Sequence, residues 1–103
     1  MAQHYDFLVI GGGSGGLAAA KRAASHGART AVAEAQALGG TCVNVGCVPK
    51  KVMWNAAGLK EAFRDAPGYG FEAAAPALDW QRLTADRAAY IERLNGIHQR
   101  NLD

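Results

Sequence analysis

The stretch "FLVIGGGSGGLAAAKRAASHGARTAVAE", residues 7–34, decides the fold. A short apolar run at residues 5–10 ends at glycine, which predicts a buried strand. Residues 14–26 are rich in alanine and stop at Gly27, a pattern typical of a helix with a glycine C-terminal signal. Residues 28–34 predict a second strand. Strand, helix and strand follow each other closely enough to form a right-handed β-α-β unit with parallel strands.

The glycines between the first strand and the helix form the pattern Gly11-x-Gly13-x-x-Gly16. The first permits a tight turn, the second lets the backbone approach a pyrophosphate, and the third lets helix and strand pack closely. Glu34 closes the second strand, where a carboxylate can accept hydrogen bonds from a ribose. This order indicates an adenine dinucleotide site but does not separate FAD from NAD. The alternative, a flexible glycine loop with a surface glutamate, explains the order poorly.

The composition bounds the class of protein. The chain has 103 residues, enough for one small domain, and half of them are apolar. Its net charge is only +2, and basic residues alternate with acidic ones, which argues against a nucleic-acid partner. No apolar run approaches membrane-spanning length, and the apolar run near the N-terminus lacks the layout of a signal peptide. We therefore expect a cytoplasmic protein with no membrane partner.

Both cysteines lie in "GGTCVNVGCVPKK", residues 39–51. On one ideal helix the Cα atoms of Cys42 and Cys47 would lie about 8.7 Å apart. A disulfide needs less than about 7 Å, so pairing would require a bent backbone. Gly46 supplies backbone freedom, and Pro49 resists a regular helix continuing behind it. A strained, accessible disulfide of this kind is easily reduced.

Three interpretations of the cysteines stay open on this evidence. A redox-active pair fits two close cysteines in a cytosolic chain. A zinc site would need two more ligands, and the candidates His4, His26 and His98 show no paired spacing, so we expect no metal. Two inert buried thiols are the third interpretation, because free cysteine is often buried. The neighbouring dinucleotide motif favours the redox pair.

Two further helices are predicted. From Val48 to Phe63, apolar residues recur at three- and four-residue steps, as on one face of a helix. Residues 65–76 read as a turn and loop, and Asp79 is a suitable N-cap for the last helix. Two parallel strands are too few for a stable doubly wound sheet, so we expect a segment of something larger. The positions expected to point inward on the last helix are Leu83, Tyr90, Ile91, Leu94 and Ile97.

The motifs "GGTCVNVGCVPKKVMW" and "IGGGSGG", together with Glu34, resemble the N-terminal part of the FAD-dependent pyridine-nucleotide disulfide oxidoreductases. The resemblance covers essentially the whole chain. It implies that residues 1–103 are the N-terminal segment of a Rossmann-like FAD-binding domain, an incomplete α/β unit followed by helices. The rest of that domain, the NADPH domain and the dimer-interface domain would be absent. FAD would be the cofactor, NADPH the electron donor, and the full-length enzyme a homodimer.

Details of the motifs resemble the members that reduce glutathione disulfide. Lys50 stands where lipoamide dehydrogenases and mercuric reductases usually carry serine. Ala18 and Lys21 stand where trypanothione reductases carry glutamate and tryptophan, and a neutral and a basic residue suit the carboxylates of glutathione. Ser14, Lys21 and His98 would contact the substrate, although the family commonly has tyrosine at the position of His98. The alternatives are a member acting on another disulfide or on mercuric ion, or a non-catalytic dinucleotide-binding fragment.

The resemblance also implies the roles of the reactive residues. Electrons would pass from NADPH through FAD to a Cys42–Cys47 disulfide and on to glutathione disulfide. Cys47 would lie against the flavin, Cys42 would attack the substrate, and Lys50 would stabilise negative charge on the reduced flavin. We expect residues 1–103 alone to be inactive. The implied cofactor-binding residues are Gly11, Gly13, Ser14, Gly15, Gly16, Glu34, Gly40, Thr41, Cys42, Cys47 and Lys50.

Overall fold

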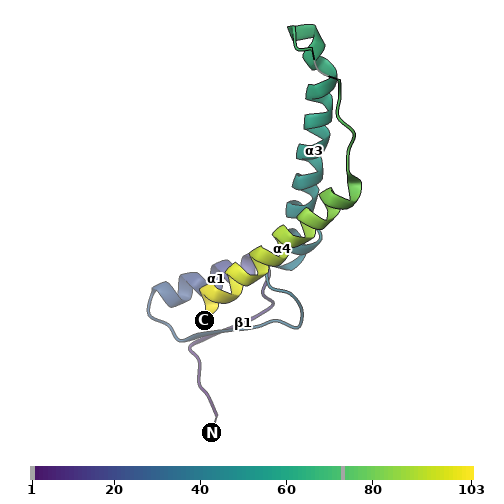
Figure 1. Ribbon diagram of the computed structural model, residues 1–103. Helices are drawn as coiled ribbons and strands as arrows, with labels where there is room; N and C mark the ends of the chain where they lie inside the picture. The colour runs from purple at the N-terminus through teal and green to yellow at the C-terminus, as the bar shows by residue number, and fades with distance from the viewer. Residues whose placement is uncertain (1, 73) are drawn as a thin grey trace.

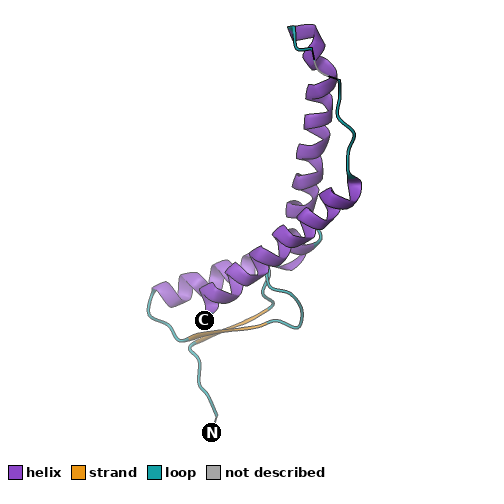
Figure 2. Cartoon of the chain, viewed as in Figure 1, coloured by secondary structure: helices purple, strands orange, loops and turns teal. Residues whose placement is uncertain are grey.

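The structure is a computed structural model that describes residues 2–72 and 74–103. A small sheet and α1 lie at one end, α3 extends away from them, and α4 runs back so that its C-terminal end lies near α1 (Figures 1 and 2). The elements in chain order are β1 (Phe7–Ile10), α1 (Ser14–Ser25), β2 (Thr30–Ala33), α2 (Gly40–Asn44), α3 (Cys47–Asp65), the 3-10 helix η1 (Ala66–Tyr69) and α4 (Trp80–Leu102).

The N-terminal third forms the predicted β-α-β unit. β1 pairs with β2 in parallel, from Phe7 opposite Thr30 to Ile10 opposite Ala33. α1 connects the two strands and packs against both. Its residues Leu17 and Ala20 are the buried apolar side chains of the described chain, with 3% and 2% of their surface exposed. The predicted fold class, an incomplete Rossmann-like α/β unit followed by helices, is confirmed.

The predicted helices are also present, with small shifts at their ends. α3 begins at Cys47, one residue before the first predicted apolar position. The Asp79 carboxylate accepts a hydrogen bond of 3.0 Å from the backbone N–H of Arg82, so it caps α4 as predicted. The segment 65–76, predicted as turn and loop, contains η1. One of its residues, Ala73, lies outside the described residues.

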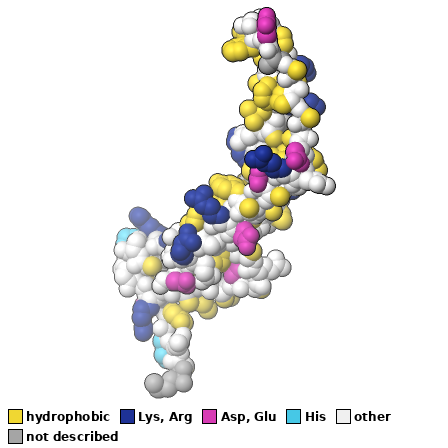
Figure 3. All heavy atoms as spheres, in the orientation of Figure 1, with side chains coloured by type: hydrophobic (Ala, Val, Ile, Leu, Met, Phe, Trp, Pro, Cys, Tyr) yellow, Lys and Arg dark blue, Asp and Glu magenta, His cyan; other side chains and the backbone are white. Residues whose placement is uncertain are grey.

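Much of the apolar surface of α3 and α4 is uncovered. Leu59 and Phe63 on α3 are 61% and 42% exposed, and Tyr90 on α4 is 43% exposed. The prediction that Tyr90 points inward is therefore wrong for the described residues. The cause is the extended shape: the radius of gyration is 20.0 Å, against about 13 Å for a compact chain of 100 residues. Figure 3 shows the resulting apolar surface along α3.

Candidate dinucleotide and disulfide site

The glycine loop between β1 and α1 is tightly built. Gly11 has a φ of +103°, in the left-handed region, and its N–H donates to the Ala33 carbonyl over 2.7 Å. A Cβ on Gly16 would collide with the Gly11 carbonyl oxygen and would lie 3.0 Å from Cγ1 of Val9. Only glycine at these two places lets α1 start directly at the end of β1.

Nothing in the described chain requires glycine at positions 13 and 15. Gly13 has an ordinary φ of −78°, and a Cβ there would meet only the Gly40 Cα, at 3.9 Å. A Cβ on Gly15 would meet no atom within 4 Å. Gly13 is the N-cap of α1, and no side chain caps that end. The first N–H groups of a helix lack intrahelical partners, so this end offers free donors and open space, which fit a phosphate group.

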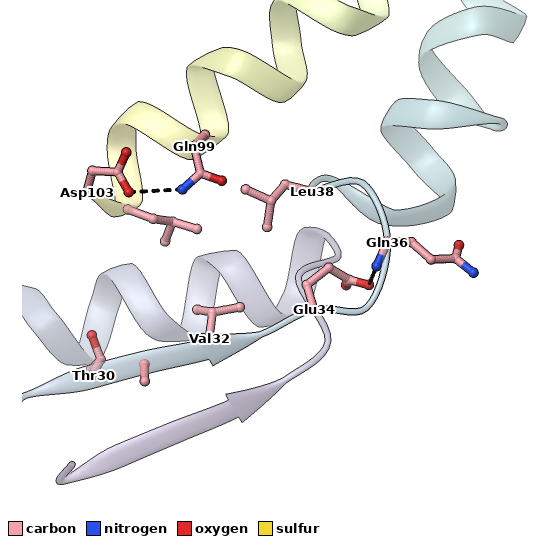
Figure 4. A pocket seen from close by; sticks show the side chains of 9 residues that line it. Thr30, Val32, Glu34, Gln36, Leu38, Gln99 and Asp103 are labelled. Carbon is pink, nitrogen blue, oxygen red and sulfur yellow. Dashed lines mark hydrogen bonds between the residues drawn. The ribbon is translucent and has the colours of Figure 1, made fainter. Parts of the chain in front are cut away.

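Glu34 holds the glycine loop in place. Its carboxylate accepts the N–H of Gly12 over 2.5 Å and the N–H of Gln36 over 3.0 Å. The hydrogen bond from Gly12 has the largest effect on the pKa of Glu34 and lowers it, and the bond from Gln36 lowers it further. Burial acts in the opposite direction. Figure 4 shows the Glu34 side chain at the end of β2 with its bond to Gln36. Glu34 thus holds the glycine loop by hydrogen bonds. The sequence analysis predicted only a ribose contact for this residue.

A cavity of about 360 Å³ opens beside Glu34, between β2, the loop after it and the C-terminal end of α4. In open parallel sheets, ligands bind outside the carboxyl ends of the strands, and this cavity extends to the carboxyl end of β2. The predicted ribose contact of Glu34 stays a prediction. The lining residues are Thr30, Ala31, Val32, Glu34, Gln36, Leu38, Gln99, Leu102 and Asp103.

The cysteine segment starts directly on the glycine loop. The Gly39 N–H donates to the Gly12 carbonyl over 2.8 Å, and Gly13 and Gly39 form an isolated parallel bridge. Gly39 and Gly40 have φ values of +102° and +65°. A Cβ on Gly40 would lie 2.8 Å from the Gly13 Cα. These contacts place the start of α2 against the start of α1.

The backbone bends between the two cysteines, as predicted for a pair that can form a disulfide. Cys42 lies in α2, Cys47 is the first residue of α3, and the break falls at Val45 and Gly46. Gly46 has a φ of −127°, so its role is not a left-handed conformation. A Cβ there would lie 2.9 Å from the Thr41 carbonyl oxygen and 3.3 Å from the Cys42 Cα. Glycine is needed because α2 and α3 approach closely.

The two thiols and Ser14 interact. Cys42 is half-buried, Cys47 is exposed, and their sulfurs are not bonded to each other. A hydrogen bond with the Cys47 side chain is the largest cause that raises the pKa of Cys42, and burial and the electrostatic effect of Cys47 raise it further. The Cys47 backbone and the Ser14 hydroxyl act in the opposite direction and lower this pKa. Cys42 is thus influenced both by Cys47 and by the start of α1.

A second cavity, also of about 360 Å³, brings together Ser14, Lys21 and His98, the three residues predicted to contact substrate. The His98 Nδ1 is buried and has no hydrogen-bond partner among the described residues. Lys50 lies three residues after Cys47 on α3, with an exposed side chain, and does not line this cavity. The binding roles stay predictions. The full lining is Ser14, Leu17, Ala18, Lys21, Gly39, Val43 and His98.

The sequence analysis missed Asn44 and Asn95, whose side chains hydrogen-bond each other over 2.9 Å. The available signal was a polar residue on the inward face of α4, next to Leu94 and two residues before Ile97.

Across residues 2–72 and 74–103, no three side chains of His, Cys, Asp or Glu gather as a metal site would require. No helix in those ranges combines the length and the apolar character of a membrane span.

Known proteins are similar to this chain in sequence. Residues 5–102 match the family described as Pyridine nucleotide-disulphide oxidoreductase. The chain is 61% identical over 103 residues to a glutathione reductase of Yarrowia lipolytica and 55% identical over 101 residues to one of Schizosaccharomyces pombe, with 96% of this chain and 22% of each relative covered. It is 51% identical over 105 residues to a glutathione reductase of Debaryomyces hansenii, covering 95% of this chain and 21% of that protein. The chain thus spans about a fifth of the length of these relatives, and it belongs to the pyridine nucleotide-disulphide oxidoreductase family.

Proposed function

We propose that the protein carrying this chain is a flavin-dependent disulfide reductase that moves electrons from NADPH through FAD and Cys42–Cys47 to glutathione disulfide. One observation carries the proposal: the Gly39 N–H donates to the Gly12 carbonyl over 2.8 Å and Gly13 pairs with Gly39, so the glycine loop lies against the segment that carries the cysteines. A glycine loop suited to a dinucleotide and a close cysteine pair therefore share one site. The relatives are named glutathione reductase, which supports the choice of substrate.

The geometry fits FAD binding by the glycine loop. The open N-terminal end of α1, at Gly13 to Gly15, would bind the pyrophosphate. The Glu34 carboxylate accepts two backbone N–H groups, and a carboxylate has about four acceptor positions, so two remain for ribose hydroxyls. FAD, when bound, supplies the electron transfer from NADPH to the disulfide. Gly40 and Thr41, at the start of α2, would add backbone contacts beside the loop.

The cysteines would carry out two thiol–disulfide exchanges. The Cys42 thiolate attacks one sulfur of glutathione disulfide, a mixed disulfide forms, and one glutathione leaves as its thiolate. The Cys47 thiolate then attacks the Cys42 sulfur, which releases the second glutathione and restores the Cys42–Cys47 disulfide. The Ser14 hydroxyl favours the first attack because it offsets part of the rise in the pKa of Cys42. Lys21 lies in the cavity beside Ser14 and would attract the glutathione carboxylates.

Titration of the full-length protein with NADPH and then glutathione disulfide, followed by absorption spectroscopy, tests the proposal. We expect a long-wavelength charge-transfer band on reduction and its loss on adding glutathione disulfide. Cys47→Ser should abolish the band, whereas Cys42→Ser should keep it because only Cys47 is proposed to lie against the flavin. A band that survives in Cys47→Ser would show the assignment to be wrong.

The rival substrates are separable by assay. Full-length protein should turn over glutathione disulfide faster than bis(glutathionyl)spermidine, because Ala18 and Lys21 give the cavity of Ser14 and His98 a neutral and a positive wall. The reverse preference would favour another member of the family. The proposal includes a cytoplasmic homodimer, which cell fractionation and light scattering test. A recombinant 1–103 fragment should be inactive, and NADPH consumption by it would contradict this.

A further inference from the structure

Two asparagine side chains tie α2 to the glycine loop and to α4. Asn44, the last residue of α2, donates from Nδ2 to the carbonyls of Leu38, over 3.2 Å, and Gly40, over 2.9 Å. Asn95, in the middle of α4, donates from Nδ2 to the Leu38 carbonyl, over 2.7 Å, and to Oδ1 of Asn44, over 2.9 Å. All four bonds are partly buried, which protects them from competing water. We call this pair the asparagine clamp.

The asparagine clamp uses every donor that its residues have. An amide side chain offers two N–H donors, and all four donors of Asn44 and Asn95 are bonded. Among the described residues, Asn95 is the only residue of α4 whose side chain hydrogen-bonds a part of the chain before Asp79. Asn95 lies 51 residues from Asn44 and 57 from Leu38, so the clamp joins distant parts of the chain.

The helix that the asparagine clamp contacts, α2, is too short to be stable by itself. α2 has only five residues, and isolated helices this short are unstable in water. It is bounded by the turn at Gly39 and Gly40 on one side and by the break at Val45 and Gly46 on the other. The place of Cys42 therefore depends on contacts with other elements. We propose that Asn44 and Asn95 are positioning residues that fix α2, and with it the Cys42 sulfur, against Cys47 and Ser14.

The consequence concerns the thiol–disulfide equilibrium, and its relevance to turnover rests on the proposed function. The Cys42–Cys47 disulfide takes up two electrons and two protons to give two thiols. Dithiothreitol supplies both as it closes to its own cyclic disulfide. A fixed α2 lowers the entropy lost when the two sulfurs join, so the clamp favours the disulfide. Releasing α2 should therefore shift the equilibrium toward the dithiol.

The test measures this equilibrium in the full-length protein. Wild type, Asn95→Ala and Asn95→Asp are equilibrated without oxygen at set ratios of reduced to oxidised dithiothreitol. Free thiols are then trapped with a mass tag, and the peptide holding Cys42 and Cys47 is read by mass spectrometry. Asn95→Ala should lower the equilibrium constant for disulfide closure about tenfold, as expected for lost amide hydrogen bonds, which is about 30 mV for this two-electron couple.

Matched variants separate positioning from other effects. Asn95→Asp should shift the equilibrium further, because its carboxylate would face the Leu38 carbonyl and Oδ1 of Asn44. Asn101→Asp makes the same charge change on the same helix, at an exposed position away from the asparagine clamp, and should stay within twofold of wild type. The double variant Asn44→Ala, Asn95→Ala should shift no more than the larger single change, since both act through α2.

Two outcomes would overturn the inference: Asn95→Ala within twofold of wild type, or an equal shift in Asn101→Asp. Circular dichroism checks folding, and if Asn95→Asp does not fold, Asn95→Ala and Asn44→Ala decide the question. Thiol trapping requires neither NADPH nor glutathione. The wild-type protein could fail to reduce glutathione disulfide while Asn95→Ala still shifts the thiol–disulfide equilibrium. That result would refute the proposed function and would still support the asparagine clamp.

Discussion

Replacing Gly46 by alanine tests why the backbone bends between the cysteines. The added Cβ would lie 2.9 Å from the Thr41 carbonyl oxygen, and ordinary contacts begin at 3.4 Å, so α2 and α3 must separate by 3.4 − 2.9 = 0.5 Å. Overpacking of this kind costs about 1–3 kcal/mol. Alanine also reduces the freedom of the unfolded chain, which stabilises by about 0.4–1 kcal/mol. The steric cost is larger, so we expect a net loss of about 1–2 kcal/mol.

Gly58→Ala is the matched control, because it lies on α3 and its Cβ would meet no atom within 4 Å. It should stabilise by about 0.5–1 kcal/mol through helix propensity alone. Chemical unfolding of the full-length protein under reducing conditions, followed by tryptophan fluorescence, measures the change in stability for both variants. The two variants should move the unfolding midpoint in opposite directions. If Gly46→Ala proves as stable as Gly58→Ala, close approach of α2 and α3 is not the reason for the glycine.

Three further substitutions have expected outcomes. Ser14→Ala removes a bond that lowers the pKa of Cys42, so the pH profile of Cys42 alkylation should move to higher pH. An unchanged profile would contradict the contact. The pKa of Glu34 is lowered by its backbone bonds, so the stability it provides is complete above the ordinary value of about 4.3 and is lost as the pH falls through the lowered pKa. Glu34→Gln should therefore flatten the dependence of unfolding on pH between about pH 5 and pH 2, and an unaltered dependence would exclude Glu34 as its source. Lys21→Glu should raise KM for glutathione disulfide about tenfold while Lys21→Arg changes it little, as expected for a charge contact. Equal KM values in the two variants would place the substrate elsewhere.

The β-α-β unit was predictable because its determinants are local. Glycine at 11 and 27, with φ values of +103° and +89°, marks the turns at both ends of α1. The Asp79 cap is likewise a signal carried by a single residue next to its helix. The bend between Cys42 and Cys47 followed from helix geometry on the condition that the two cysteines pair, since an unbroken helix would hold them too far apart for a disulfide.

Burial was less predictable. Periodicity identifies which face of a helix is apolar, but it does not show what covers that face. Leu59 and Phe63 have the spacing of a buried stripe, yet α3 extends beyond the rest of the described chain and leaves them exposed. Tyr90 was assigned inward on the same reasoning. These residues fit a surface that pairs with further protein, as expected if residues 1–103 are a segment of a larger domain.

The position of Cys42 shows why a motif is not a complete site. The sequence from Gly39 to Lys50 carries both thiols and the glycines that break the helix, and all of this is local. However, the breaks that let the two thiols meet also leave α2 too short to keep its own place. Asn95, far along the chain, restores that place through the asparagine clamp. The same twelve residues without Asn95 would therefore keep their two thiols and lose part of their preference for the disulfide.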